Sequence, residues 1–379
     1  MKIKSLFFTG LMLVSVNAWS QLTLTMGGDV NFNKNLFKTS AVGFLTGNGN
    51  VPTPWANYVA GIKPMIDGDL NFANIETVIS ERNDLPAETK AYVFHTHPNA
   101  IQQLIDVGFN LFNLANNHAY DYGFAGINET LNSVQSLKNR NPQIETFGLG
   151  YQADLLKPVV FQKNGYTIAV ASVSIIDKRF KATNTSPGLI HIWSQEEYRQ
   201  IIKNMKATSA HYKILSIHFG TEGQVALDNR QKEYYEYAIK NGVDLIIGHH
   251  PHAVRPIQKI GNKYIFYSLG NYLMLGSANI TGLEGGADFG LFAKLHLVLN
   301  SEGRLQPEAV QLTALTNTHS VTKPLLGSTG QKRLAALNAL SESQIGREAF
   351  TPEVQSSGQA LFCETEVTSN SAKKICPPR

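Results

Sequence analysis

The chain has 379 residues, of which 43% are hydrophobic and 16% are charged, and its formal net charge is +4. This composition can bury one large core or two modest ones, and it excludes an intrinsically disordered protein. The small net charge gives no broad basic surface for nucleic acid, so we expect no nucleic-acid partner.

Residues 1–20 have the three parts of a signal peptide. Lys2 and Lys4 precede an apolar run from Leu6 to Val16, and Ala18-Trp19-Ser20 forms a small-residue cleavage site. The alternative, a membrane anchor, is disfavoured because this run is too short to cross a hydrocarbon core of about 30 Å. We therefore expect an exported protein, periplasmic or secreted, with no transmembrane anchor after cleavage.

The first half of the mature chain alternates strand-like and helix-like segments. Strands are expected at 22–26, 69–74 and 110–115, and helices at 100–107 and 123–137. The helix at 100–107 is indicated by apolar residues at helical spacing, and Gly108 ends it.

The second half repeats this alternation. Hairpins are expected around Asn164-Gly165 and Gly261-Asn262. Further strands are expected at 213–217, 243–247 and 291–299, and helices at 196–205 and 231–240. Strands that alternate with helices indicate an α/β fold. We assign residues 21–350 to one domain.

The last segment, residues 351–379, is polar and is predicted to be a tail. It contains both cysteines of the chain, Cys363 and Cys376. In an exported protein two nearby cysteines favour a disulfide, and two free thiols are the alternative.

Polar residues follow several of the predicted strands at the point where each strand ends. They are Asp29, Glu76, Asn117, His118, His218, His250 and His252. Ligands of open α/β sheets bind outside the carboxyl ends of the strands, so we expect these side chains to meet in one site.

The residue types in this set suit a divalent transition metal. Imidazole and carboxylate ligands together fit Mn, Fe or Zn. The sequence from Gly248 to His252 is the strongest single feature, because three histidines within four positions after an apolar strand are seldom buried for packing alone. We predict one or two ions, and two would suit hydrolysis by in-line displacement.

Six motifs in this order resemble the CapA family, the bacterial capsule-synthesis proteins associated with poly-γ-glutamate. They are Gly27-Gly28-Asp29, Asn74-Ile75-Glu76, Asn116 to Gly123, His218 to Glu222, Gly248 to His252 and Tyr267 to Asn271. The resemblance runs from about residue 22 to about residue 345. That family is similar to the calcineurin-like metallophosphoesterases.

This resemblance implies a metallophosphatase-like four-layer α/β/β/α sandwich with a two-metal site between its sheets. It implies a bridging carboxylate at Glu76. One metal would be completed by Asn117, His218 and His250, and the other by Asp29 and His252. It also implies His118 as the general acid, oriented by Asp121.

One position departs from the phosphoesterase pattern. Those enzymes usually place a histidine two residues after the first aspartate, whereas this chain has Asn31. The departure puts two-metal stoichiometry and ordinary phosphoesterase activity in question.

Three further residues are predicted to contact substrate, each with a structural alternative. Glu222 could instead cap a turn, Arg255 could be an ion-pair partner, and Asn271 could be a hairpin residue.

The leading functional hypothesis is an exported metal-dependent hydrolase that acts on a phosphoester or a γ-glutamyl amide. Its expected partners are an anionic cell-envelope polymer or its precursor, and a membrane-bound polymer synthase or export complex. The alternative is a non-catalytic protein that binds the polymer and assists its export. A periplasmic nucleotidase is disfavoured, because no aromatic pair that would sandwich a base is identified.

Overall fold

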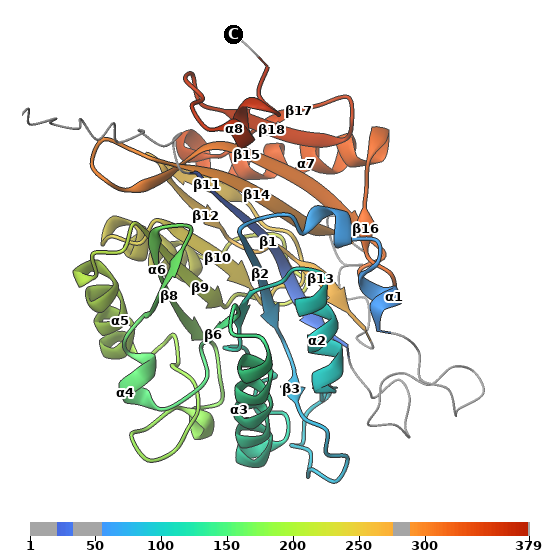
Figure 1. Ribbon diagram of the computed structural model, residues 1–379, viewed down its shortest axis with the longest axis vertical. Helices are drawn as coiled ribbons and strands as arrows, with labels where there is room; N and C mark the ends of the chain where they lie inside the picture. Colours follow the sequence, from blue (N-terminus) through green and yellow to red (C-terminus); the bar gives the residue numbers. More distant parts are fainter. Residues whose placement is uncertain (1–20, 33–54, 276–288, 378–379) are drawn as a thin grey trace, which may run out of the picture.

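A computed structural model describes residues 21–32, 55–275 and 289–377. The predicted signal peptide, residues 1–20, lies outside the described residues. Two β-sheets stack face to face, with helices on their outer faces (Figure 1). This arrangement confirms the expected four-layer α/β/β/α sandwich.

The larger sheet has ten strands in the order β17-β18-β15-β14-β1-β2-β5-β6, with β13 beside β1 and β16 beside β15. Its parallel part contains β1, β2, β5, β6 and β13, and its antiparallel part begins where β14 pairs with β1. The strands are β1 (Gln21–Asn31), β2 (Leu70–Ile75), β5 (Leu111–Asn113), β6 (Glu145–Phe147), β13 (Asn271–Met274), β14 (Gly290–Leu299), β15 (Leu305–Thr316), β16 (Lys323–Pro324), β17 (Glu353–Val354) and β18 (Gln359–Cys363).

The smaller sheet has six strands in the order β11-β12-β10-β9-β8-β7. Its central strands β8, β9, β10 and β12 are parallel, and hairpins close both edges. The strands are β7 (Val159–Lys163), β8 (Tyr166–Ser174), β9 (Tyr212–His218), β10 (Leu245–His249), β11 (Ile257–Ile260) and β12 (Lys263–Phe266). A separate two-stranded sheet joins β3 (Val78–Ile79) to β4 (His95–Thr96).

Helices cover the outer faces of both sheets (Figure 1). The outer face of the ten-stranded sheet carries α1 (Ala56–Val59), α2 (Pro98–Asp106) and α3 (Gly123–Arg140). Helix α7 (Gly327–Ile345) packs on β15 and β18 on the inner face of this sheet, beside β11 of the smaller sheet. The six-stranded sheet carries α4 (Gln152–Leu155), α5 (Gln195–Ala207) and α6 (Asn229–Lys240). The last helix is α8 (Asn370–Lys373), and short 3₁₀ turns lie at η2 (Lys63–Met65), η3 (Lys178–Phe180) and η5 (Gly346–Glu348).

The strands of the smaller sheet are buried on both faces, which explains their nearly continuous apolar sequences. In β9, Ile214 points into the core between the two sheets, while its neighbour Leu215 packs under α5 and α6. Each such side chain contributes about 1.5–3 kcal/mol through burial. The two sheets are therefore held together by a continuous apolar layer.

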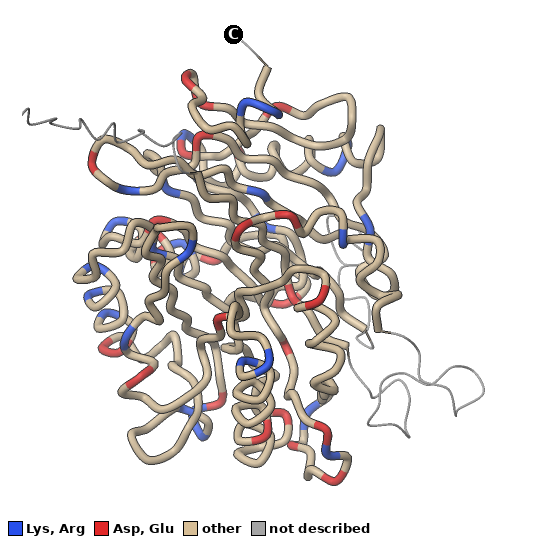
Figure 2. Tube along the Cα trace, viewed as in Figure 1, with Lys and Arg blue, Asp and Glu red and all other residues tan. Residues whose placement is uncertain are grey.

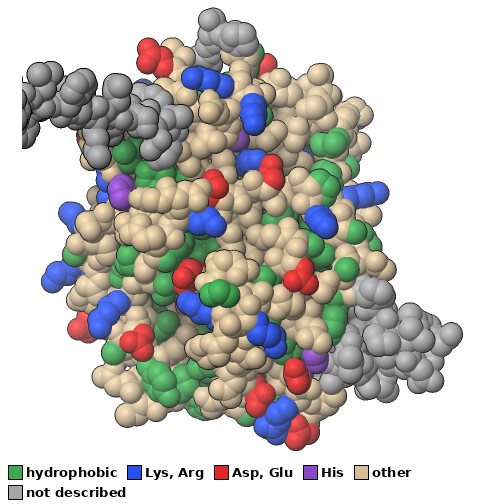
Figure 3. Space-filling view, viewed as in Figure 1, with side chains coloured by type: hydrophobic (Ala, Val, Ile, Leu, Met, Phe, Trp, Pro, Cys, Tyr) green, Lys and Arg blue, Asp and Glu red, His purple; other side chains and the backbone are tan. Residues whose placement is uncertain are grey.

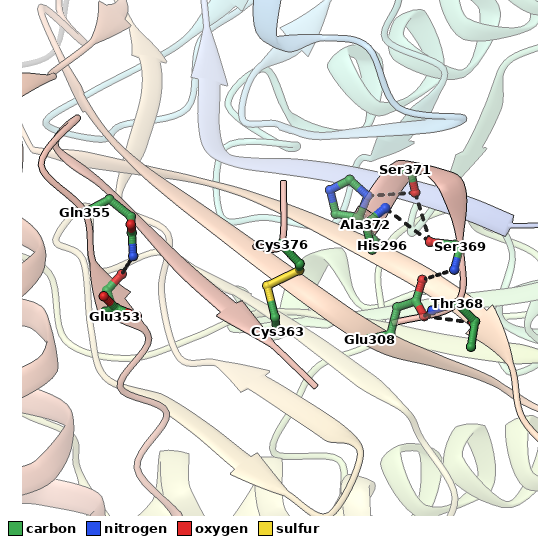
Figure 4. The surroundings of a disulfide bond; sticks show 10 residues. All are labelled: His296, Glu308, Glu353, Gln355, Cys363, Thr368, Ser369, Ser371, Ala372 and Cys376. Atoms are coloured by element: carbon green, nitrogen blue, oxygen red, sulfur yellow. Dashed lines mark hydrogen bonds between the residues drawn. A yellow bond between two sulfur atoms is a disulfide. The ribbon is translucent and has the colours of Figure 1, made fainter. Parts of the chain in front are cut away.

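The C-terminal segment, which the sequence predicts to be a tail, takes part in the larger sheet. Strand β18 pairs with β15 along five residues, from Ala309 opposite Cys363 to Thr313 opposite Gln359. The predicted disulfide between Cys363 and Cys376 is present (Figure 4). Beside it, the buried Glu308 carboxylate accepts hydrogen bonds from the backbone of Thr368 and Ser369 (Figure 4).

Charged side chains of both signs are interspersed along the chain and on the face shown in Figure 3 (Figures 2 and 3). In the described part of the chain, no helix combines the length and the apolar character needed to span a bilayer.

Candidate metal centre

The predicted ligands come from both sheets and meet between them. Strands β1 and β2 run parallel, as do β9 and β10, so their carboxyl ends lie at one edge of each sheet. Asp29 and Glu76 come from the ten-stranded sheet. The histidines come from the ends of β9 and β10 in the six-stranded sheet. They are His218, His250 and His252.

Two glycines allow β1 to pass close to the chain that leads into β13. A Cβ atom on Gly28 would lie 1.8 Å from the carbonyl oxygen of Gly270, and one on Gly27 would overlap the ring of Tyr272. The register with β2 shifts here, between Met26 and Asp29. The Gly-Gly-Asp motif is therefore needed to present the Asp29 carboxylate from inside the sheet.

The histidine motif after β10 has an unusual backbone. His250 has φ of 98° and His252 has φ of 52°, in the left-handed region that residues with side chains seldom adopt. Such conformations concentrate at functional sites, where the surrounding structure enforces them. Here they place two imidazoles of the loop beside the carboxylates.

Two three-residue groups could each hold a metal ion, and they share Glu76. One consists of Glu76, His218 and His250, and the other of Asp29, Glu76 and His252; within each group the ligand atoms lie within 4.8 Å of one another. His218 Nε2 lies 3.3 Å from Glu76 Oε1, and His252 Nε2 lies 3.7 Å from the same oxygen. Asn117 Oδ1 lies 2.7 Å from His218 Nε2, beside the first group.

Glu76 gives the test of whether these residues fit a cation. Both of its carboxylate oxygens are buried, and neither has a hydrogen-bond partner among the described residues. Buried carboxylates are normally paired or coordinate a metal, because an unpaired buried charge is costly. The donor set of imidazole nitrogens and carboxylate oxygens suits a divalent transition metal, so the residues fit the predicted ion.

The electrostatics of this cluster follow from its burial. Burial and the nearby negative charge of Asp29 raise the pKa of Glu76 well above its usual range. Burial also raises the pKa of Asp29, but contact with His249 and the charges of His218 and His252 more than offset this and lower it. Burial lowers the pKa of His218, and that of His250 to about 3. Both imidazoles are therefore neutral at pH 7, as metal ligands must be.

A histidine–carboxylate pair lies next to this cluster. His118 Nδ1 lies 2.7 Å from Asp121 Oδ2, and burial lowers the pKa of His118. The ring of Phe94 stacks on the His118 ring at 4.1 Å between centroids. Lys90 Nζ donates to Asp121 Oδ1 and to the carbonyl oxygen of Asn117. The imidazole is thus fixed in orientation by a buried carboxylate that is itself held in place.

The three residues predicted to contact substrate are placed differently from one another. Glu222 is half-exposed, with Oε1 3.9 Å from His250 Nδ1. Asn271 is buried, and its Oδ1 lies 2.7 Å from His252 Nδ1, so it orients a candidate ligand. Arg255 is fully buried and donates to Thr221 O, Gln224 O and Gln231 Oε1. Its guanidinium therefore fastens the loop that carries Glu222 and is not accessible to a substrate.

Asn31 lies on β1 outside both three-residue groups. Its Nδ2 donates to the carbonyl oxygen of Leu275, and its Oδ1 accepts from Thr96 Oγ1, both at 3.4 Å. The group around Asp29 thus contains one histidine, His252, where the phosphoesterase pattern would supply a second.

Three contributors to the site were not assigned from the sequence. Asn74 Nδ2 donates to Asp29 Oδ1 at 2.7 Å and lies 3.3 Å from His218 Nδ1. His249 Nδ1 lies 3.0 Å from Asp29 Oδ1. Asn74 and His249 lie inside recognised motifs and could have been singled out, whereas Lys90 lies in a loop without any pattern.

Comparison with known proteins places this site in a family. The family model described as "Bacterial capsule synthesis protein PGA_cap" matches residues 23–275, which is more than half of the chain and includes every candidate metal ligand. The chain belongs to this family.

Similar proteins are also named for the synthesis of capsule or PGA. The chain is 29% identical over 246 residues to the PGA biosynthesis protein CapA of Bacillus subtilis, covering 64% of this chain and 61% of that protein. It is 25% identical over 262 residues to the capsule biosynthesis protein CapA of Bacillus anthracis, covering 67% and 60%. The chain therefore spans about three fifths of the length of these relatives.

Similar solved structures include a hypothetical protein of Thermus thermophilus, with 14% identity, a TM-score of 0.41 and coverage of 77% of this chain and 98% of that one. The NAD nucleotidase of Haemophilus influenzae matches with 12% identity, a TM-score of 0.40 and coverage of 85% and 56%.

Proposed function

We propose that this PGA_cap family member is an exported, metal-dependent hydrolase that acts in the synthesis, processing or anchoring of a capsule polymer such as poly-γ-glutamate. Family membership supports the association with capsule polymers. The observation that carries the metal dependence is Glu76, whose two oxygens are buried without hydrogen-bond partners between candidate ligands from two sheets.

In this proposal the protein's own residues bind and orient the reactants. Glu76 would bridge two ligand sets, one completed by His218, His250 and Asn117, and the other by Asp29 and His252. A divalent ion held there supplies Lewis acidity, which polarises a phosphoryl or carbonyl oxygen. The bond cleaved is a phosphoester or a γ-glutamyl amide.

His118 is proposed as the general acid. Its Nδ1–H donates to Asp121, so Nε2 faces the leaving atom and can donate a proton to it only when the ring is protonated at both nitrogens, a form that the Asp121 charge stabilises against the effect of burial. The low dielectric around the buried Asp121 carboxylate keeps this orientation fixed. Glu222, at the half-exposed mouth of the site, is proposed to contact the substrate.

Metal content per chain tests this proposal first. We expect about one or two equivalents of Mn, Fe or Zn in protein spanning residues 21–379, measured by elemental analysis. His250→Ala should lower the content, whereas His97→Ala, which changes a histidine at the start of α2, should not. Protein that stays metal-free after incubation with all three ions would contradict the proposal.

A second candidate function is a non-catalytic accessory protein that binds the polymer during export or anchoring. Asn31 favours it, because the Asp29 group then has only one imidazole ligand. Complementation of a deletion strain separates the two functions. Capsule formation restored by the His250→Ala variant supports the accessory role, whereas restoration by wild type alone supports the metal-dependent role.

A further inference from the structure

A second polar cavity lies at the opposite end of the smaller sheet from the candidate metal centre. It has a volume of about 550 Å³ and is formed where the turn between β14 and β15 meets the amino-terminal ends of β9 and β10. Lys213 is the second residue of β9 and His218 is its last, so at about 3.3 Å per residue the two sites are roughly 17 Å apart. The cavity is therefore distinct from the site already described.

Hydrogen bonds between the two sheets hold the walls of this cavity in place. Leu305 N donates to His211 O at 2.9 Å, and Asn262 Nδ2 donates to Gln306 Oε1 at 2.7 Å. The β14–β15 turn therefore rests on the edge of the six-stranded sheet (Figure 1), and Figure 2 shows charged positions on this turn. A cavity of this size can hold a ligand of dipeptide size.

The cavity lining has an excess of positive charge. Its charged residues are Lys206, Lys213, Lys263, Arg304, Asp244 and Glu302. Asp244 is already engaged, since its Oδ2 accepts from Arg304 and from the backbone N–H of Lys213, and its Oδ1 lies 3.9 Å from Lys263 Nζ. Neither Lys206 nor Lys213 forms an ion pair with a carboxylate of the described residues.

The amine of Lys213 lies among other cations of the cavity lining. Burial, followed by the positive charge of Arg304, lowers the pKa of Lys213. Lys213 Nζ donates to the carbonyl oxygen of Lys206, which holds the amine at the cavity wall without neutralising it. A bound anion would relieve the repulsion among these cations.

We propose that this cavity binds a dicarboxylate, namely the terminal unit of a γ-linked glutamyl chain. That unit carries a free α- and a free γ-carboxylate, and their two negative charges match the excess of two positive charges in the lining. The choice of a glutamyl chain rests on the proposed function, whereas the anion site itself rests on the cavity. Binding here would hold the end of a polymer on the surface opposite the metal centre.

Calorimetric titration with γ-glutamyl-glutamate tests this inference on protein spanning residues 21–379 at low salt. The test variant is Lys206→Gln/Lys263→Gln, whose two positions are less buried than Lys213. Loss of two charged contacts should weaken binding roughly a hundredfold. The matched control is Lys203→Gln, one turn earlier on α5 and outside the cavity, which should bind like wild type.

The outcomes separate this inference from the proposed function. Binding that is retained in His250→Ala and lost in the double variant supports the inference. Binding that is lost in His250→Ala and retained in the double variant would assign the ligand to the metal centre and overturn the inference alone. No binding of the dipeptide to wild type, or binding of inorganic phosphate with equal affinity, would overturn the dicarboxylate site. A thermal melt of the double variant establishes that it is folded.

Discussion

Lys90 connects the candidate general acid to the candidate metal centre. Its Nζ lies 2.5 Å from Asp121 Oδ1 and 2.7 Å from the carbonyl oxygen of Asn117. Asp121 is fully buried and also accepts from Phe94 N and contacts His118 Nδ1. One cation thus holds both the residue that orients the acid and the backbone of a candidate ligand.

Replacement of this lysine should therefore be costly. We expect Lys90→Met to lower the free energy of unfolding by about 1–3 kcal/mol, because a buried carboxylate loses a charged hydrogen-bond partner. Chemical denaturation measures the effect. Lys138→Met is the control, since the Lys138–Glu145 pair is more exposed and should contribute at most about 1 kcal/mol. Equal effects of the two substitutions would show that Lys90 is an ordinary surface lysine.

Individual site residues could be predicted where the sequence contains a pattern. The residues Asp29, Glu76, His218 and His250 each follow an apolar strand, and sheet geometry brings strand ends together. Lys90 could not be predicted, because it lies between β3 and β4 in a segment whose path depends on tertiary contacts. Arg255 follows the histidine motif, yet its guanidinium is buried in hydrogen bonds with a neighbouring loop.

At the scale of elements, α8 is attached to β14 through a histidine. His296 Nδ1 lies 2.8 Å from Ser371 Oγ, and its Nε2 is buried without a hydrogen-bond partner among the described residues (Figure 4). A protonated imidazole would need an acceptor at both nitrogens. Burial, followed by the positive charge of Lys294, accordingly lowers the pKa of His296 to about 4.

This contact should make stability depend on pH. The unfolded chain binds a proton at His296 below its ordinary pKa of 6.5, whereas the folded chain does so only below about 4. The stabilisation is therefore present above pH 6.5 and is lost as the pH falls towards 4, by on the order of 1–3 kcal/mol. Denaturant midpoints of wild type and His296→Gln across this range measure it. The variant should show the shallower dependence, and His211→Gln, which keeps His296, should match wild type.

Elements with a clear periodicity could be predicted, and those that depend on distant pairing could not. The helix expected at 123–137 is observed as α3, and the strand expected at 213–217 is observed as β9. No expectation covered β15 or α7. Strand β15 is buried on both faces and therefore lacks alternation, and few of the α7 side chains are buried. Strand β18 joins the sheet through pairing with β15, which a polar sequence does not indicate.

In the whole molecule, the candidate metal centre connects the two sheets. Asp29 and Glu76 belong to the larger sheet, whereas His218, His250 and His252 belong to the smaller one. Apolar packing holds the sheets together elsewhere, but at this edge the two buried carboxylates of the larger sheet, which repel each other, lie against the histidines of the smaller sheet. A bound cation would relieve the repulsion between the carboxylates and link the two layers through their common ligands.

The change Glu76→Gln should consequently have opposite effects with and without metal. In metal-free protein the Glu76 carboxyl must either carry a buried charge beside Asp29 or bind a proton at a raised pKa. The neutral amide removes this cost, so the thermal midpoint should rise by about 2 °C or more. Saturating metal should stabilise wild type by about 2.7 kcal/mol at a hundredfold excess over its Kd, and the variant far less. Calorimetric melts with and without Mn, Fe or Zn measure both effects.

The control for these opposite effects of Glu76→Gln is another buried carboxylate of the same sheet. Glu308 accepts hydrogen bonds from Thr368 N, Thr368 Oγ1 and Ser369 N, so its charge is already compensated. Glu308→Gln should therefore lower the midpoint of metal-free protein and leave the stabilisation by metal unchanged. If Glu76→Gln behaved in the same way, Glu76 would be an ordinary structural carboxylate, and the link between the two sheets would not depend on a cation.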